Sequence, residues 1–178
     1  MTDEEKYQKA IEHLNELIKL FPDDYLYYFG RGRIYSNLKK YELAIADYSK
    51  AIELNPNYSE AYNNRGVDYS DLKKYELAIA DYSKAIELNP NLSEAYNNRG
   101  NAYYSLEKYD LAIADYSKAI ELNPNLSDAY NNRGVAYSDL KKYELAIADY
   151  SKAIEFNPND SEAYKNRELA YQKMSDLF

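Results

Sequence analysis

Residues 55–88 read NPNYSEAYNNRGVDYSDLKKYELAIADYSKAIEL, and the rest of the chain consists of copies or fragments of this stretch. Later copies begin at Asn89, Asn123 and Asn157, so the period is 34 residues with no insertion. The copy at 21–54 is degenerate at its start and returns to the pattern at KKYELAIADYSKAIEL. A fixed period of this length predicts a stacked array in which each unit contacts mainly its neighbours.

Each unit carries helical periodicity twice. Tyr62, Gly66 and Tyr69 share one face of a first helix, and the spacing resumes from Tyr75 to Ile86 in a second helix. The unit is therefore predicted to be a helix–turn–helix hairpin. The turn between its helices, around Lys73-Lys74, contains no glycine, so the sequence does not fix its boundaries closely.

A proline motif separates consecutive units. In Asn89-Pro90-Asn91, the proline disfavours a helical residue before it and cannot donate a helical hydrogen bond. This motif predicts the end of the second helix. We expect Asn91 to cap the next helix, with Glu94 completing a capping-box pair.

The spacing and the residue types resemble the tetratricopeptide repeat (TPR). The family's aromatic, small and proline positions are matched in the second unit by Tyr62, Gly66, Tyr69, Ala78, Tyr82 and Pro90, and in the other full units at the same spacing. The resemblance implies an all-α fold, a right-handed α-solenoid of stacked antiparallel helix hairpins (the TPR superhelix). Tyrosine stands where the family usually has tryptophan, and arginine stands where it usually has leucine.

The ends of the chain read as half-units. We expect one solenoid over 1–178, with a second-type helix at 1–20, full repeats at 21–54, 55–88, 89–122 and 123–156, and a capping helix at 157–178. That arrangement gives ten helices. Thr2 and Glu5 form a capping-box start. Glu168 replaces the glycine of the repeat, as a terminal unit without a close partner helix would allow.

An arginine recurs in a position that is otherwise part of the core. We predict that it pairs with the aspartate 16 residues later, because a guanidinium beside a core needs a partner. The expected pairs are Arg31–Asp47, Arg65–Asp81, Arg99–Asp115 and Arg133–Asp149. Arg167 has no following helix and is expected to be exposed to solvent.

Composition excludes several classes of function. Net charge is −8, and a nucleic-acid interface requires a basic face, so no nucleic-acid partner is expected. No apolar run is long enough to predict a membrane span. Cysteine is absent and His13 is the only histidine, and the chain lacks phosphate-loop, nucleophile-elbow and metal-ligand motifs. We therefore expect no enzyme activity, no cofactor and no metal site.

The candidate site is the surface of the first helices that faces away from the second helices. In the family, the matching positions line a concave groove that binds extended peptides. Stacked asparagines suit a peptide main chain, because each amide offers a donor and an acceptor. The candidate groove residues are Phe29, Arg33, Asn63, Asn64, Val67, Asn97, Asn98, Asn101, Tyr104, Asn131, Asn132, Val135 and Asn166.

Two interpretations of this surface remain open. The chain is either a protein–protein interaction module whose groove binds a basic or neutral segment, or a structural repeat array that acts through its ends or edges. In the second case, the asparagine pair was copied with the unit. Some family members hold a C-terminal carboxylate with a basic clamp, and its lysines are replaced here by residues such as Asn63 and Glu94. The chain is expected to be mainly a monomer, with end-to-end association as the alternative.

Overall fold

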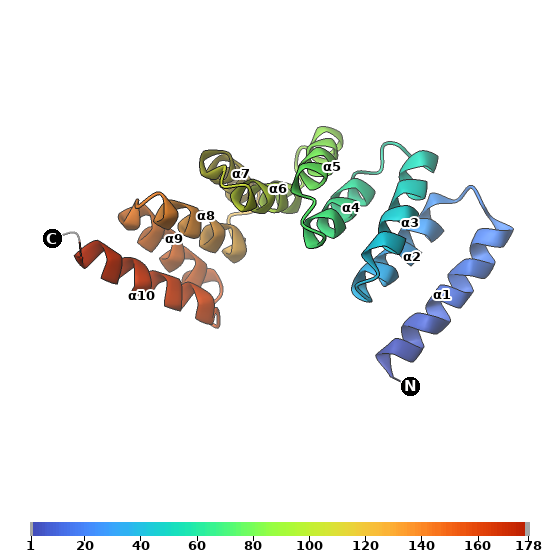
Figure 1. The fold of residues 1–178 in the computed structure, drawn as a ribbon, viewed down its shortest axis with the longest axis horizontal. Coiled ribbons are helices and arrows are strands. Elements are labelled where there is room, and N and C mark those ends of the chain that lie inside the picture. Colours follow the sequence, from blue (N-terminus) through green and yellow to red (C-terminus); the bar gives the residue numbers. More distant parts are fainter. Residues whose placement is uncertain (1, 177–178) are drawn as a thin grey trace. The chain divides into compact units, whose positions relative to one another are not determined.

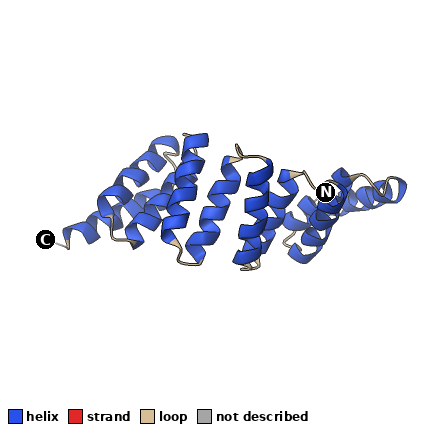
Figure 2. Cartoon of the chain, turned by 90° about the horizontal axis from the view of Figure 1, so that it is seen from above, coloured by secondary structure: helices blue, strands red, loops and turns tan. Residues whose placement is uncertain are grey.

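The computed structural model describes residues 2–176. Ten α-helices occupy them, joined by short loops, and none of these residues belongs to a strand (Figures 1 and 2). The helices are α1 (Asp3–Leu20), α2 (Tyr25–Asn37), α3 (Tyr41–Leu54), α4 (Ser59–Asp71), α5 (Tyr75–Leu88), α6 (Ser93–Ser105), α7 (Tyr109–Leu122), α8 (Ser127–Asp139), α9 (Tyr143–Phe156) and α10 (Ser161–Ser175). The predicted all-α fold of repeated helix hairpins is confirmed.

The structure divides into two compact units at the Pro90–Asn91 junction. Unit 1 contains α1 and the hairpins α2–α3 and α4–α5, and unit 2 contains the hairpins α6–α7 and α8–α9 followed by α10. Within each unit, the two helices of a hairpin pack together, and the second helix of one hairpin packs on the first helix of the next. Each unit is described on its own below.

The turn inside each hairpin uses a left-handed residue that is not glycine. Lys39, Lys73, Glu107 and Lys141 have φ between 56° and 58°. In the second hairpin, the Lys74 amide donates to the Tyr69 carbonyl at 2.8 Å and the Lys73 amide donates to the Ser70 carbonyl at 2.8 Å. These bonds satisfy the last carbonyls of α4, as a Schellman ending does.

The loop between hairpins differs from the expectation at the helix start. The residue before α6 is Leu92, which makes no side-chain capping bond, so the predicted cap by Asn91 is wrong. The first asparagine of the motif, rather than the last, makes a side-chain hydrogen bond, and this bond lies within the loop. Asn55 Oδ1 accepts from the Asn57 amide at 3.2 Å, and Asn123 Oδ1 accepts from the Asn125 amide at 3.3 Å. The predicted Thr2–Glu5 capping box is confirmed.

The core of each hairpin is a tyrosine ring set against a glycine. Tyr82 on α5 is 2% exposed, and a Cβ added to Gly66 would lie 2.7 Å from its ring. The same contact joins Gly134 to Tyr150, and the alanines around it are fully buried. Glycine is thus required here for close approach of the two helices. The ring supplies the bulk that fills the space left by the missing side chain.

The recurring arginine holds three helices together. Arg65 Nε and Nη2 each donate to Asp81 at 2.7 Å, and its Nη1 donates to Ser49 Oγ on the preceding hairpin at 2.9 Å. Its guanidinium also lies 5.6 Å and 5.9 Å from the rings of Tyr62 and Tyr69, within cation–π range. All four predicted Arg–Asp pairs are present and bidentate. The pKa of each of these four arginines is raised, and for Arg31, Arg99 and Arg133 the bond to the aspartate is the largest cause. For Arg65 the largest single effect is burial, which lowers the pKa, but the bond to Asp81 and the Asp81 charge together outweigh it.

The prediction for Arg167 is wrong. This residue is half-buried, its Nη1 donates to Ser151 Oγ at 3.2 Å, and its guanidinium lies 5.5 Å from the Tyr164 ring. The contact with the preceding hairpin and with the tyrosine of its own helix does not need a following helix. These two interactions hold the side chain against α9 and α10, so it is only partly exposed.

Candidate functional site

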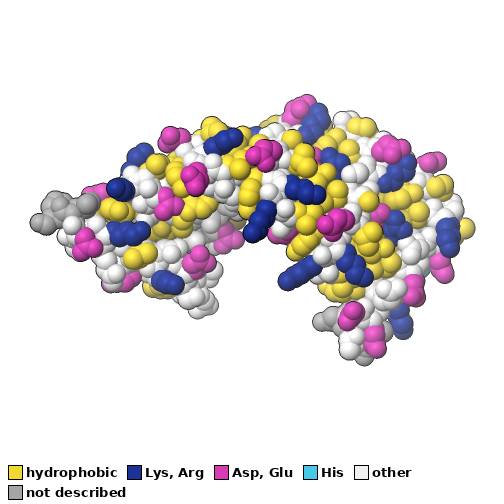
Figure 3. All heavy atoms as spheres, viewed as in Figure 1, with side chains coloured by type: hydrophobic (Ala, Val, Ile, Leu, Met, Phe, Trp, Pro, Cys, Tyr) yellow, Lys and Arg dark blue, Asp and Glu magenta, His cyan; other side chains and the backbone are white. Residues whose placement is uncertain are grey.

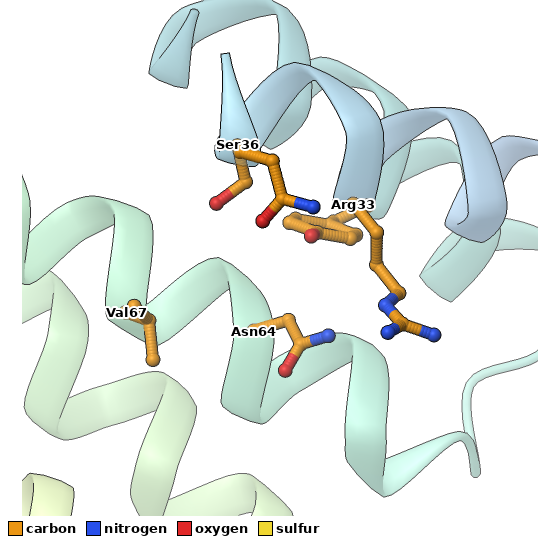
Figure 4. Close-up of a pocket in the computed structure, with 6 residues that line it drawn as sticks. Arg33, Ser36, Asn64 and Val67 are labelled. Atoms are coloured by element: carbon orange, nitrogen blue, oxygen red, sulfur yellow. The ribbon is translucent and has the colours of Figure 1, made fainter. Parts of the chain in front are cut away.

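Unit 1 contains a cavity of about 160 Å³ between α2 and α4, lined by Arg33, Ser36, Asn37, Tyr48, Asn64 and Val67. Figure 4 shows Arg33 and Ser36 on α2 facing Asn64 and Val67 on α4. Helical spacing explains the α2 wall, because residues three and four positions apart share a face. The cavity thus brings together three of the predicted groove residues, Arg33, Asn64 and Val67.

A buried tyrosine forms part of the cavity wall. The Tyr48 ring is 1% exposed against Gly32, and burial raises the pKa of its hydroxyl well above the usual value, with Asp68 adding to the effect. The phenol is therefore neutral at physiological pH. It offers one proton and two lone pairs to Ser36, Asn64 or a bound group.

Two predicted residues of unit 1 do not line this cavity. Phe29 packs its ring at 4.8 Å from Tyr58 and 5.7 Å from Tyr48, with Arg33 above it at 6.0 Å. Phe29 therefore supports Arg33 from below. Asn63 is 7% exposed and belongs to the interior of the α4 packing.

Unit 2 contains two adjoining cavities on the same side of α6 and α8. The larger, about 470 Å³, is lined by Asn97, Asn98, Asn101, Asp128, Asn131, Asn132, Asn157, Asp160 and Glu162. The smaller, about 280 Å³, is lined by Asn101, Tyr104, Ser105, Tyr116, Asn131, Asn132, Val135 and Glu162. Together they include every predicted groove residue of unit 2 except Asn166.

Asparagines of successive first helices bond to one another. Asn132 Nδ2 donates to Asn97 Oδ1 at 3.3 Å, and Asn166 Nδ2 donates to Asn131 Oδ1 at 3.2 Å. Asn131 lines both cavities but is only 8% exposed, so a small part of its side chain reaches the cavity surface. Each bond uses the Nδ2 group of one asparagine as the donor, so the Asn132 side chain keeps the acceptor capacity of its oxygen.

Tyrosine hydroxyls extend the polar lining of unit 2. The Tyr116 hydroxyl donates to Asn101 Oδ1 at 2.8 Å. The Tyr104 hydroxyl donates to Asp139 Oδ2 at 2.5 Å, and burial followed by this bond raises the pKa of Tyr104 well above its usual value. Both phenols stay protonated in the physiological range, so this wall keeps its pattern of donors and acceptors.

The cavities of the two units differ in charge. Arg33 is the one ionisable side chain besides Tyr48 in the lining of the unit 1 cavity, whereas Asp128, Asp160 and Glu162 line the larger cavity of unit 2. Asp160 is already engaged, because its Oδ1 accepts from the Glu162 and Ala163 amides at the start of α10. On the face in Figure 3, acidic and basic side chains are interspersed with hydrophobic ones.

Two other features bear on the class of site. Across residues 2–176, no three or more histidine, aspartate or glutamate side chains gather where they could hold a metal ion. No helix in the same range is both long enough and apolar enough to span a bilayer. His13 is exposed on α1, away from the cavity linings.

Sequence analysis missed several lining residues. Ser36 and Asn37 lie three and four positions after Arg33, so helical spacing alone would have added them to the site. Tyr48 and Tyr116 occupy the same repeat position as Tyr82, whose ring is buried, and the structure shows that a buried ring can still form part of a cavity lining. No sequence signal distinguished these hydroxyls from those of the other tyrosines.

Comparison with known proteins places this geometry in a family. The model of the tetratricopeptide repeat matches residues 25–58, 59–92, 93–126 and 127–160. A search of curated proteins found no match.

Solved structures share the fold. A crystal structure of MamA has a TM-score of 0.81 at 26% identity, over 89% of this chain and 93% of that one. The TPR protein YrrB, described as having an unusual peptide-binding site, has a TM-score of 0.78 at 24% identity, over 92% and 84%. The first TPR of Spaghetti (RPAP3), solved with the HSP90 peptide SRMEEVD, has a TM-score of 0.65 at 32% identity, over 66% and 93%. With four repeats matched over most of its length, the chain belongs to the tetratricopeptide repeat family.

Proposed function

We propose that this chain is a protein–protein interaction module that binds extended segments of a partner along the first helices of its repeats. The observation that carries the proposal is the asparagine-lined cavity on these helices, present in unit 1 at Asn64 and in unit 2 at Asn98 and Asn132. An amide can bond to a main chain whatever its side chains are, so one repeated residue serves successive stretches of peptide. The peptide complex of the Spaghetti TPR is consistent with this use of the fold.

The two asparagines of each repeat have different roles in this proposal. Asn131 is nearly buried and accepts from Asn166 of the next repeat, while Asn132 lines both cavities of unit 2 and uses its Nδ2 to donate to Asn97. We assign main-chain binding to Asn64, Asn98 and Asn132. Asn97 holds Asn132 by a hydrogen bond, we assign the same supporting role to Asn63 and Asn131, and the Phe29 ring packs against Arg33.

The partner segment is proposed to be basic or neutral where it meets unit 2. Asp128, Asp160 and Glu162 line the larger cavity there, and no lysine or arginine lines it. Complementary charge would speed association and make it sensitive to salt. The lysines of a basic carboxylate clamp are absent from the corresponding positions, so an acidic C-terminal tail is a poorer fit than a basic segment.

Replacing Asn64, Asn98 and Asn132 together by alanine is expected to weaken binding of neutral and basic peptides by tenfold or more. Each neutral hydrogen bond contributes roughly 0.5–1.5 kcal/mol net. The measurement is fluorescence anisotropy with a panel of twelve-residue peptides that differ in net charge, at low and at physiological salt. Circular dichroism checks that the variant is folded.

A matched control replaces Lys50, Lys84 and Lys118 by alanine. These residues recur at the same 34-residue spacing on the second helices, outside the cavity linings. The control should bind the neutral peptides as the parent does, because the loss of three positive charges affects mainly charged peptides. If the asparagine variant also binds as tightly as the parent, the asparagines are copied structure and the proposed groove is wrong.

The end of α10 supports a second candidate function, assembly through the chain ends. Tyr164, Leu169 and Tyr171 on this helix are 44–47% exposed. Tyr164 and Tyr171 correspond to Tyr62 and Tyr69 of α4, which are partly buried in unit 1. Glu168 at the glycine position opposes close docking of another helix there. We therefore expect a monomer by light scattering at micromolar concentration. Growth to larger species with concentration would favour assembly through the ends instead.

A further inference from the structure

Asp68 is an exception in the repeat. The corresponding residues of the later copies are Ala102, Ala136 and Ala170, and all three are fully buried. Asp68 is fully buried as well, although it carries a carboxyl group. A carboxyl group in a position shaped for a methyl group is costly unless it is neutral or paired.

The partners of Asp68 are incomplete. Its Oδ1 accepts from Ser36 Oγ on α2 at 2.6 Å, while its Oδ2 is the one buried side-chain oxygen or nitrogen in the described residues that has no hydrogen-bond partner. The ion pairs of the described residues do not include it. One neutral donor is little compensation for a buried carboxylate.

The groups around Asp68 do not supply a positive charge to it. Asp71 lies one turn along α4 and adds negative charge, and Tyr41 and Tyr48 on α3 and Tyr82 on α5 are neutral phenols that feel the Asp68 charge. On α2, Ser36 donates to Asp68, whereas Arg33 lines the neighbouring cavity and is not among the groups that shift the Asp68 pKa. Among the described residues, the Ser36 bond is thus the one effect that favours the ionised form, and burial and the Asp71 charge both favour the protonated one.

We propose that Asp68 makes the packing of α4 against α2 and α3 depend on pH, so that unit 1 is tighter when this carboxyl is protonated. A protonated carboxyl is neutral and gains one donor for its surroundings. An ionised carboxyl at the same place leaves a buried charge with a single donor. Because Ser36 and Tyr48 also line the unit 1 cavity, the proton acts directly beneath that cavity.

The direction of the effect follows from the pKa. Burial raises the pKa of Asp68 from 3.8 to about 6, and Asp71 raises it further, while the Ser36 bond lowers it. The native state therefore binds this proton more tightly than the unfolded chain does. The added stability is fully present below about pH 3.8 and is lost as the pH rises through about 6.

The test compares urea unfolding of the parent and of Asp68→Asn between pH 5 and pH 7.5. The parent's unfolding equilibrium constant should rise about tenfold more than that of Asp68→Asn over this range, because asparagine does not titrate. Asp71→Asn, an exposed change on the same helix, should keep most of the parent's pH dependence but move it to lower pH, because Asp71 no longer raises the pKa of Asp68. Equal pH dependence of the parent and Asp68→Asn would overturn the proposal.

Two further measurements do not depend on the stability of the Asp68 variant. In the unmodified protein, the NMR titration of the Asp68 carboxyl carbon should have its midpoint near pH 6, and a midpoint near 4 would contradict the proposal. Amide hydrogen exchange in α2 and α4 should accelerate between pH 5 and pH 7.5 beyond the intrinsic chemical rate, whereas α8, where Ala136 holds this position, should not. A uniform response of α4 and α8 would count against a local switch.

Discussion

Replacing Arg133 by alanine is expected to lower the free energy of unfolding by about 3–5 kcal/mol. Asp149 would then be left 6% exposed with its two guanidinium donors gone, and Ser117 would lose its contact with α8. Removing one partner of a buried pair costs more than the pair contributes, because the remaining charge stays desolvated. The measurement is urea unfolding followed by circular dichroism at neutral pH.

Three controls separate this effect from general damage. Arg167→Ala should cost clearly less, because that guanidinium donates to Ser151 and pairs with no aspartate. Lys152→Ala removes an exposed pair with Glu155 and should have little effect. Replacing Arg133 and Asp149 together by methionine and leucine should recover much of the loss. A cost below about 1 kcal/mol for Arg133→Ala would show that the pair is not desolvated.

Alanine at Gly134 and alanine at Gly30 are expected to change stability in opposite directions. At Gly134, the new Cβ would lie 2.7 Å from the ring of Tyr150. This ring is 2% exposed, so it has little room to move away. At Gly30, the nearest atom is a Leu14 methyl at 3.8 Å, an ordinary contact. Both glycines are inside helices, where alanine has the better propensity.

We expect Gly134→Ala to destabilise the protein by about 1–3 kcal/mol, since overpacking outweighs the gain in propensity. Gly30→Ala should stabilise it by about 0.5–1 kcal/mol. Thermal unfolding of the two variants in parallel makes the comparison. In a Tyr150→Ala background, Gly134→Ala should no longer be unfavourable. A penalty that persists there would mean that the clash with Tyr150 is not its cause.

The sequence predicted the fold well because the repeat states each constraint several times. Proline after every second helix, one glycine–tyrosine pair in each full repeat and the arginine–aspartate spacing all recur, so a single misleading position has little weight. Two predictions were wrong, because each assumed a side-chain partner from the residue pattern alone. Arg167 lacks its aspartate but finds Ser151 and Tyr164, and Leu92 precedes α6 without any capping side chain.

The candidate site was only partly predictable. Helical spacing identified the face that carries Asn64, Val67 and Asn132, and these residues do line cavities. It could not show that Asn131 is covered by its neighbours, because burial of a polar side chain depends on the next repeat. The part that Tyr48 and Tyr116 take in the cavity linings could not be predicted for a similar reason. Their rings belong to the core, and only the hydroxyl ends reach the cavities.

The left-handed turn residues set a rule for how this chain can change in length. With Lys141 at φ 58°, the last carbonyls of α8 are bonded within the turn, and α9 starts at Tyr143 with no spare residue. One inserted residue there would rotate the register of α9 by about 100° and carry Asp149 away from Arg133. Length changes are therefore compatible with the fold when they add or remove a complete 34-residue copy, as duplication of a gene segment would do.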